Sequence, residues 1–170
     1  MSLKWIGAVL IVGGCGGVGF LMAWNYHREL KALRQLLTVL EDMRCELESR
    51  MPPLPELLRS SVRRVSGGVQ ALLLQLAEEL ELQIQPDVSG CMESSLLHAS
   101  KLPERIVGYM KDLGNSLGVF DLPGQLAGLE SIRLNCLQDL QELEMHKEQR
   151  TRSYQTLGLC AGAALAVLLI

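Results

Sequence analysis

The hydrophobic pattern of the chain begins and ends with an uncharged apolar run. The first covers residues 6–23, 18 consecutive positions without a charged side chain. As a helix rising about 1.5 Å per residue it reaches about 27 Å, close to the roughly 30 Å hydrocarbon core of a bilayer. Trp5 and Trp24 flank it, as interfacial aromatic residues do. Residues 157–170, or 154–170 counted from Tyr154, form a second run at or below the short end of the spanning range. We therefore expect transmembrane segments at 1–26 and 154–170, with a domain of residues 27–153 between them.

Apolar positions in this central domain recur at helical spacing. Leucines at 30, 33, 37, 40 and 47 predict an amphipathic helix over about 28–50 that continues near the first membrane segment. Prolines and glycines separate the helices that follow. The second helix ends at Gly67 and Gly68, and the next two cover about 69–85 and 88–101. A fifth helix begins at Pro103, and the last helix begins at about residue 122. The pattern predicts an all-α fold, a bundle of about six helices between N- and C-terminal transmembrane helices.

Charge orients this arrangement and excludes one class of partner. The central domain holds all 19 acidic residues and 15 of the 16 basic ones, with no concentrated basic patch. Phosphate binding needs such a patch, so we expect no binding to nucleic acid. The positive-inside rule places the central domain in the cytoplasm, because its two membrane-proximal flanks carry Arg28, Lys31, Arg34, Lys147, Arg150 and Arg152.

The cysteines leave one alternative for the N-terminal segment. Val12 to Cys15 resemble a lipobox, which would make Cys15 a lipidated terminus after cleavage. The apolar run continues beyond Cys15 to residue 23, however, which favours an uncleaved span. The cysteines at 45, 91 and 136 have no C-x-x-C spacing and are interpreted as small buried hydrophobic residues.

The sequence indicates no catalytic chemistry. Its three histidines, at 27, 98 and 146, are isolated from one another and from any set of ligands at metal-binding spacing. The acidic pairs, such as Glu78 and Glu79, lie beside apolar helical stripes, where carboxylates normally face solvent. We expect no enzyme activity, no catalytic residue, no cofactor and no metal.

Two sets of residues are candidates for contacts with other molecules. The least helical stretch of the central domain contains Gly114, Asn115, Ser116, Gly118 and Asp121. It is interpreted either as a helix–helix turn, with Gly118 as a left-handed cap and Asp121 as an N-cap, or as a loop that a partner recognises. In the apolar ends, Gly13 with Gly17 and Gly158 with Gly162 have the small-xxx-small spacing that lets membrane helices approach closely.

Several elements resemble the stage III sporulation protein AB family of endospore-forming Firmicutes, over nearly the whole chain. They are Leu3-Lys4-Trp5-Ile6-Gly7-Ala8, Arg34-Gln35-Leu36, Pro53-Leu54-Pro55-Glu56, Leu113-Gly114-Asn115-Ser116-Leu117-Gly118 with Asp121, and the small residues of the C-terminal segment. The Leu-Gly-x-x-Leu-Gly-x-x-Asp element is the most specific. Met51-Pro52 departs from the family, which usually has a polar residue such as Thr before Pro-Leu.

The resemblance implies a fold and a function. The family is similar, in its soluble domain, to the cytoplasmic domains of the inner-membrane platform proteins of type II secretion and type IV pilus systems, which implies a six-helix bundle. It implies a scaffold, on the mother-cell side of the cell membrane, in a secretion-like complex between mother cell and forespore. The expected partners are a secretion-type ATPase, other membrane subunits of the channel and the lipid bilayer. The alternative is a membrane-anchored lipoprotein or receptor bundle that binds a ligand outside the cytoplasm.

Overall fold

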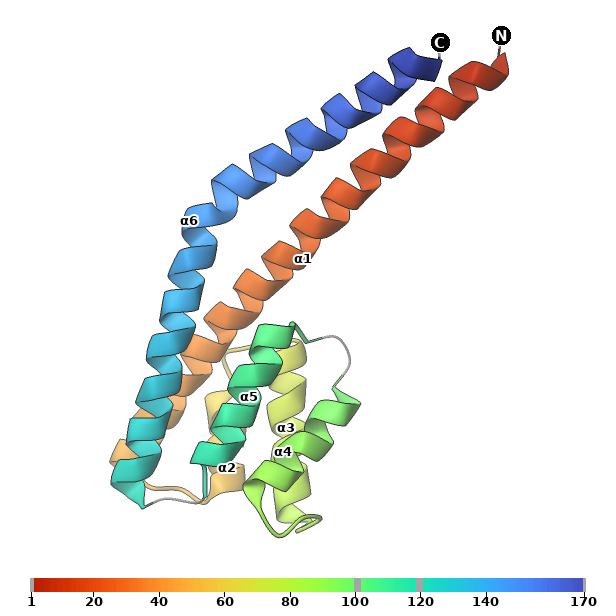
Figure 1. Cartoon of the computed structure of the whole chain (residues 1–170). Helices are drawn as coiled ribbons and strands as arrows, with labels where there is room; N and C mark the ends of the chain where they lie inside the picture. The colour runs from red at the N-terminus through yellow and green to blue at the C-terminus, as the bar shows by residue number, and fades with distance from the viewer. Residues whose placement is uncertain (1, 100–101, 119–120, 170) are drawn as a thin grey trace. The chain divides into compact units, whose positions relative to one another are not determined.

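The computed structural model describes the backbone of residues 2–99, 102–118 and 121–169, and the side chains of residues 24–99, 102–118 and 121–145. This part of the chain contains six α-helices and no strand, which confirms the predicted all-α fold (Figure 1). The helices are α1 (Ser2–Ser49), α2 (Leu54–Ser61), α3 (Gly68–Glu81), α4 (Val88–His98), α5 (Glu104–Ser116) and α6 (Leu122–Leu169).

The structure divides into two compact units. One comprises Met1–Arg28 with Gln141–Ile170, and the other comprises Glu29–Leu140. In the second unit, hereafter the bundle, α2 packs on α3, α3 on α4 and α4 on α5 (Figure 1). Pro53 and Pro103 precede α2 and α5, where a missing N–H costs nothing, and the Asp87 side chain caps α4 by accepting a hydrogen bond from the Gly90 N–H.

The core of the bundle forms from the predicted apolar stripes. It includes α1 side chains, such as Leu33 and Met43, and the α6 side chains Leu129 and Cys136. The Cys136 thiol lies 3.7 Å from the carbonyl oxygen of Leu33, 103 residues away in the sequence. The largest fully buried side chains are Leu33, Leu36, Leu40, Met43, Leu57, Leu58, Leu72, Leu73, Leu76, Met92, Ile106 and Met110. Burying each of these large side chains favours folding by about 1.5–3 kcal/mol of transfer free energy.

Three helices are shorter than their apolar patterns predict. The α4 helix, expected over about 88–101, ends at His98. After α2 ends at Ser61, Val62 and Val65 remain buried, but the backbone follows turns with hydrogen bonds from Arg63 N–H to Ser60 and from Val65 N–H to Val62. Gly67, at φ +88°, does not end α2 but immediately precedes α3. The α3 helix stops at Glu81 rather than near residue 85. The period of a hydrophobic stripe therefore marked the buried face correctly without marking where the helix ended.

The other unit contains the ends of the two long helices. Each of α1 and α6 is a single helix of 48 residues, as the predicted continuation of the 28–50 helix requires. The Tyr26 hydroxyl donates a hydrogen bond to the Leu143 carbonyl oxygen. Within the part of the chain whose side chains are described, no helical segment has the length and apolarity needed to cross a bilayer. The uncharged runs at 6–23 and 157–170 lie outside those residues.

Candidate partner interface

The predicted partner-binding stretch includes the last turn of α5 and the first residue before α6. Gly114, Asn115 and Ser116 are helical, so the prediction of a loop from Gly114 onward was wrong for these three residues. The helix continues because both Leu113 and Leu117 are fully buried. The Leu117 N–H donates to the Leu113 carbonyl oxygen at 3.0 Å.

Gly114 allows α5 to lie very close to α4. A Cβ atom added at this position would be 2.8 Å from the Met92 Cβ and 3.6 Å from the Ser89 Cα. Both Gly114 and Met92 are buried, so neither side of the contact can move into solvent. A glycine is needed at position 114 because any side chain there would occupy space that Met92 fills.

Gly118 ends the α5 region with a left-handed residue, as the turn interpretation predicts. Its φ is +79°, a conformation that glycine adopts without steric cost. A Cβ atom added here would lie 2.7 Å from the Val88 Cγ2 atom. Val88 is the first residue of α4. The turn after α5 therefore lies directly against the start of α4.

Asp121 has the capping role that the sequence indicates. Its side chain accepts a hydrogen bond from the Gly124 N–H at 3.2 Å, and its carbonyl oxygen accepts one from Gln125 at 2.9 Å. Ser116 packs against Gly128 of α6, where an added Cβ atom would be 2.9 Å from the serine side chain. Asn115 and Asp121 are exposed. They are the predicted residues whose side chains a partner can reach without unfolding the turn.

The predicted membrane-packing pairs, Gly13 with Gly17 and Gly158 with Gly162, lie outside the residues whose side chains are described. Their backbones belong to α1 and α6.

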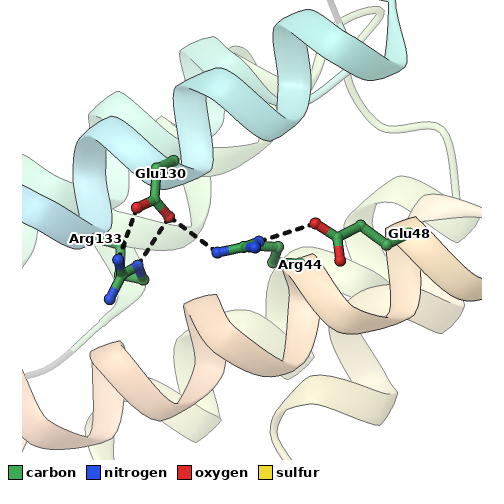
Figure 2. A network of polar contacts seen from close by, with 4 residues as sticks. All are labelled: Arg44, Glu48, Glu130 and Arg133. Carbon is green, nitrogen blue, oxygen red and sulfur yellow. Dashed lines mark hydrogen bonds and ion pairs between the residues drawn. The ribbon is translucent and has the colours of Figure 1, made fainter.

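A second group of polar residues joins α1 to α6 within the bundle (Figure 2). The Glu130 carboxylate accepts two hydrogen bonds from the Arg133 guanidinium, at 2.7 and 2.9 Å, and one from the Arg44 guanidinium, at 3.3 Å. Arg44 also donates to Glu48 at 2.9 Å. A pocket of about 320 Å³ lies beside these groups and is lined by Glu41, Arg44, Cys45, Glu48 and Arg133. The two ion pairs of Arg44 are solvent-exposed, so each contributes little to stability, whereas the Glu130–Arg133 pair is partly buried.

We expect this network to lose its attraction in acid. The hydrogen bond from Arg133, followed by the charges of Arg133 and Arg44, lowers the pKa of Glu130. A carboxyl group whose pKa is lowered in the folded state stabilises the fold at pH values above its unfolded-state pKa. This stabilisation is lost as the pH falls through the folded-state pKa. Urea unfolding between pH 7 and pH 3 should therefore show a smaller loss of stability in Glu130→Gln than in the unmodified chain. If both proteins lose the same stability in acid, the ionised Glu130 carboxylate does not stabilise the fold.

A third polar group ties α5 to both long helices. Arg105 pairs with Glu29 of α1 at 3.2 Å and with Asp139 of α6 at 3.0 Å. The Tyr109 hydroxyl donates to the same Asp139 carboxylate at 2.8 Å. Burial, together with this hydrogen bond to an anion, raises the pKa of Tyr109 well above its usual range. The phenol therefore stays protonated and holds Asp139 in place.

The cysteines differ sharply in accessibility. Cys91 and Cys136 are buried as predicted, whereas Cys45 is exposed, so the prediction of burial was wrong for this residue. Burial is the main reason that the pKa of Cys136 rises to about 12, which keeps the thiol protonated at neutral pH. In the region with described side chains, no cluster of three or more His, Cys, Asp or Glu residues could hold a metal ion.

Sequence reasoning missed the polar groups on the bundle surface. The Arg44–Glu48 and Glu130–Arg133 pairs follow the helical spacings of four and three residues and were detectable in principle. The pairs Arg44–Glu130 and Arg105–Glu29 join residues far apart in the chain, and no local signal marks them.

Comparison with known proteins defines the family. A family model described as stage III sporulation protein AB matches residues 4–170. The chain belongs to this family. Stage III sporulation protein AB of Bacillus subtilis (strain 168) is 23% identical over 171 residues, which cover 99% of each chain.

A solved structure of a stage III sporulation protein AB has the same fold. Its likeness to this chain has a TM-score of 0.62 at 17% sequence identity, over 72% of this chain and 98% of the solved one. At this identity the likeness supports the all-α fold and carries no residue roles. The resemblance noted from the sequence elements is thus confirmed at the level of the family.

Proposed function

We propose that this chain is a membrane platform subunit of a secretion-like complex between mother cell and forespore, required for endospore formation. The observation that carries the proposal is the extent of the family match, which covers residues 4–170 and so includes the bundle and both apolar ends. The uncharged runs support two membrane segments, and the basic flanks support a cytoplasmic position for the bundle on the mother-cell side.

The bundle would act as a docking body for a cytoplasmic ATPase, while the apolar ends contact other membrane subunits. Scaffolding of this kind requires a domain that keeps its shape under load. The support for it is the pairing of Arg105 with both long helices and the dense core that α1 and α6 share. Close-packed interiors resist compression and transmit displacement from one element to another.

Docking at the turn between α5 and α6 can be tested with changes that spare the fold. Asn115→Arg alters an exposed side chain, and Asp121→Asn keeps an N-cap oxygen while it removes the charge. We would purify the tagged full-length chain in detergent from sporulating cells and quantify the secretion-type ATPase of the same complex by mass spectrometry.

The proposal predicts that the ATPase copurifies with the unmodified chain and is depleted in both variants, at unchanged melting temperature. Exposed Lys111 of α5, changed to Glu, serves as the matched control on the same helix. Absence of the ATPase from the unmodified preparation would refute the docking role. If both variants retain the ATPase, the ATPase contacts another surface of the bundle.

The cytoplasmic position of the bundle makes a prediction about Cys45. We expect a membrane-impermeant maleimide to leave Cys45 unlabelled in intact cells and to label it once the membrane is permeabilised, because the thiol is exposed on the bundle. Cys45→Ser identifies the signal among the five cysteines. Cys136 cannot serve as the probe, because it is buried and its pKa is raised to about 12. Labelling of Cys45 in intact cells would favour the lipoprotein or receptor alternative.

A further inference from the structure

The connection between α3 and α4 presents two large apolar side chains to solvent. Leu82 is 65% exposed and Ile84 is 54% exposed, on either side of Gln83. We call residues 82–84 the apolar tip. The tip lies at the end of the bundle that also carries the turn between α5 and α6 (Figure 1). Val88, four residues beyond Ile84, contacts Gly118 of that turn.

The backbone of the apolar tip is held in a defined conformation at the end of α3. The Ile84 N–H donates to the Glu79 carbonyl oxygen at 3.2 Å, and the Gln83 N–H donates to Leu80 at 3.3 Å. This pair of bonds is the Schellman motif of helix ends, in which the left-handed residue is usually glycine. Here the left-handed residue is Gln83, at φ +49°. Gln83 thus adopts a conformation that is unfavourable for any residue with a side chain.

The apolar contact that normally accompanies this motif is missing from the tip. In Schellman motifs the second residue beyond the cap frequently packs on an apolar residue three or four positions before the cap. Here the second residue is Ile84, and the positions before the cap are Glu79 and Glu78, which supply carboxylates rather than an apolar surface. Ile84 consequently remains more than half exposed. Its own helix end does not account for an isoleucine at this position.

The start of α4 fixes the other side of the tip. The Asp87 carboxylate accepts hydrogen bonds from the Gly90 N–H, at 3.1 Å, and from the Ser89 hydroxyl. The hydroxyl bond is the main reason that the pKa of Asp87 is lowered. Pro86 restricts the backbone immediately before this cap. The backbone of the tip is restricted by hydrogen bonds at the end of α3 and at the start of α4. Binding through the tip therefore costs less conformational entropy than binding through a flexible loop.

Charge defines what can cover the tip. The α3–α4 hairpin, residues 68–98, contains the acidic residues Glu78, Glu79, Glu81, Asp87 and Glu93 and no lysine or arginine. Glu79 is buried, contrary to the expectation that both carboxylates of the Glu78–Glu79 pair face solvent, and Arg59 of α2 pairs with Glu81 at 2.7 Å. Glu78 and Glu93 are exposed. An acidic hairpin with an apolar end repels a second copy of itself and the anionic surface of a membrane. It complements an apolar groove with a basic rim.

We propose that the apolar tip is a docking surface for a protein partner whose apolar groove, rimmed by lysine or arginine, receives Leu82 and Ile84. The inference rests on the proposed scaffolding function only in requiring a protein partner, and it does not require that partner to be the ATPase. The contact between Val88 and Gly118 makes the tip continuous with the candidate turn. The two surfaces form one end of the bundle.

Site-specific photo-crosslinking in the full-length chain tests the proposal. A benzophenone amino acid replaces Leu82, Ile84 or, as a control, Leu97, which is 87% exposed on the same hairpin but lies near the other end of α4. Crosslinks are induced in sporulating cells, and the products are identified by mass spectrometry. The captured protein is then purified, and its affinity for the detergent-solubilised chain is measured with and without added salt.

We expect positions 82 and 84, but not 97, to capture one and the same protein. Leu82→Ser and Ile84→Ser should each weaken its binding about 10-fold to 100-fold, the loss of one buried aliphatic side chain. Leu97→Ser should leave binding unchanged, whereas Glu78→Lys and added salt should weaken it.

Three results would overturn the proposal: no common product at 82 and 84, equal capture at 97, or binding that ignores Glu78→Lys. Crosslinks only to lipid or to a second copy of the chain would do the same. Capture of a protein other than the ATPase, with the expected variant pattern, would retain the docking surface and count against the ATPase as its occupant. Failure of the docking proposal and failure of the ATPase proposal thus give different results.

Discussion

Gly114→Ala should destabilise the bundle, whereas Gly108→Ala on the same helix should stabilise it. Alanine is favoured over glycine inside a helix by about 1 kcal/mol, and at position 108 nothing lies within 4 Å of an added Cβ atom. At position 114 the new methyl group would lie 2.8 Å from the Met92 Cβ. Overpacking of this kind typically costs about 1–3 kcal/mol, which outweighs the gain in helix propensity.

Urea unfolding followed by circular dichroism, with both variants in the same detergent, measures the two effects. Met92→Ala supplies a check on the cause, since it removes the side chain that the new methyl group meets. In the Met92→Ala background the penalty of Gly114→Ala should shrink, and the double-mutant cycle gives the coupling between the positions. If Gly114→Ala and Gly108→Ala shift the midpoint equally, the close approach of α4 and α5 is wrong.

Gly118→Ala should destabilise the bundle through both the backbone and the packing. Gly118 has a φ of +79°, and an L-residue in the left-handed region costs roughly 1–2 kcal/mol. A Cβ atom added at this position would also lie 2.7 Å from the Val88 Cγ2 atom. Val88 is β-branched and stiff about its first side-chain torsion, so it cannot turn aside without cost. The clash should add about 1–3 kcal/mol to the backbone cost.

Melting curves of Gly118→Ala, Val88→Ala and the double variant test this account. In the Val88→Ala background the loss caused by Gly118→Ala should shrink to the backbone cost alone. An unrestored double variant would show that backbone conformation alone sets the requirement for glycine at 118. The same clash means that Gly118→Val disturbs the fold, so it cannot by itself report on partner binding.

The sequence predicted most of the fold because the bundle follows local rules. The leucine stripe of α1 is buried as expected except at Leu37, which is half-buried. Pro53, Pro103 and Asp121 lie where their chemistry places helix starts. The errors came at helix ends. Val65 is buried yet lies in a turn beyond α2, and Gln83 ends α3 in a position where glycine is the usual signal. Burial depends on tertiary contacts, so an apolar residue at helical spacing does not guarantee a helix.

The candidate site was only partly predictable. The sequence marked Gly118 and Asp121 as a cap pair, and their local chemistry was sufficient for that. It could not show that Gly114 is needed for the approach of Met92, because the two residues meet only after α4 and α5 pack. Nor could it distinguish the exposed Leu82 from the buried Leu76 of the same helical stripe. That difference depends on where α3 ends.

The contact between Cys136 and the Leu33 carbonyl oxygen also bears on how the chain folds during synthesis. The two residues are 103 positions apart, and α1 and α6 supply facing parts of one core. A nascent chain makes α1 first, so the part of its apolar face that packs on α6 stays uncovered until the ribosome has released the part of α6 that includes Leu129 and Cys136. Contacts between distant residues form slowly, and exposed apolar surface favours aggregation in the meantime. Packing of α6 therefore completes the core, and the short helices α2 to α5 are synthesised before the core is complete.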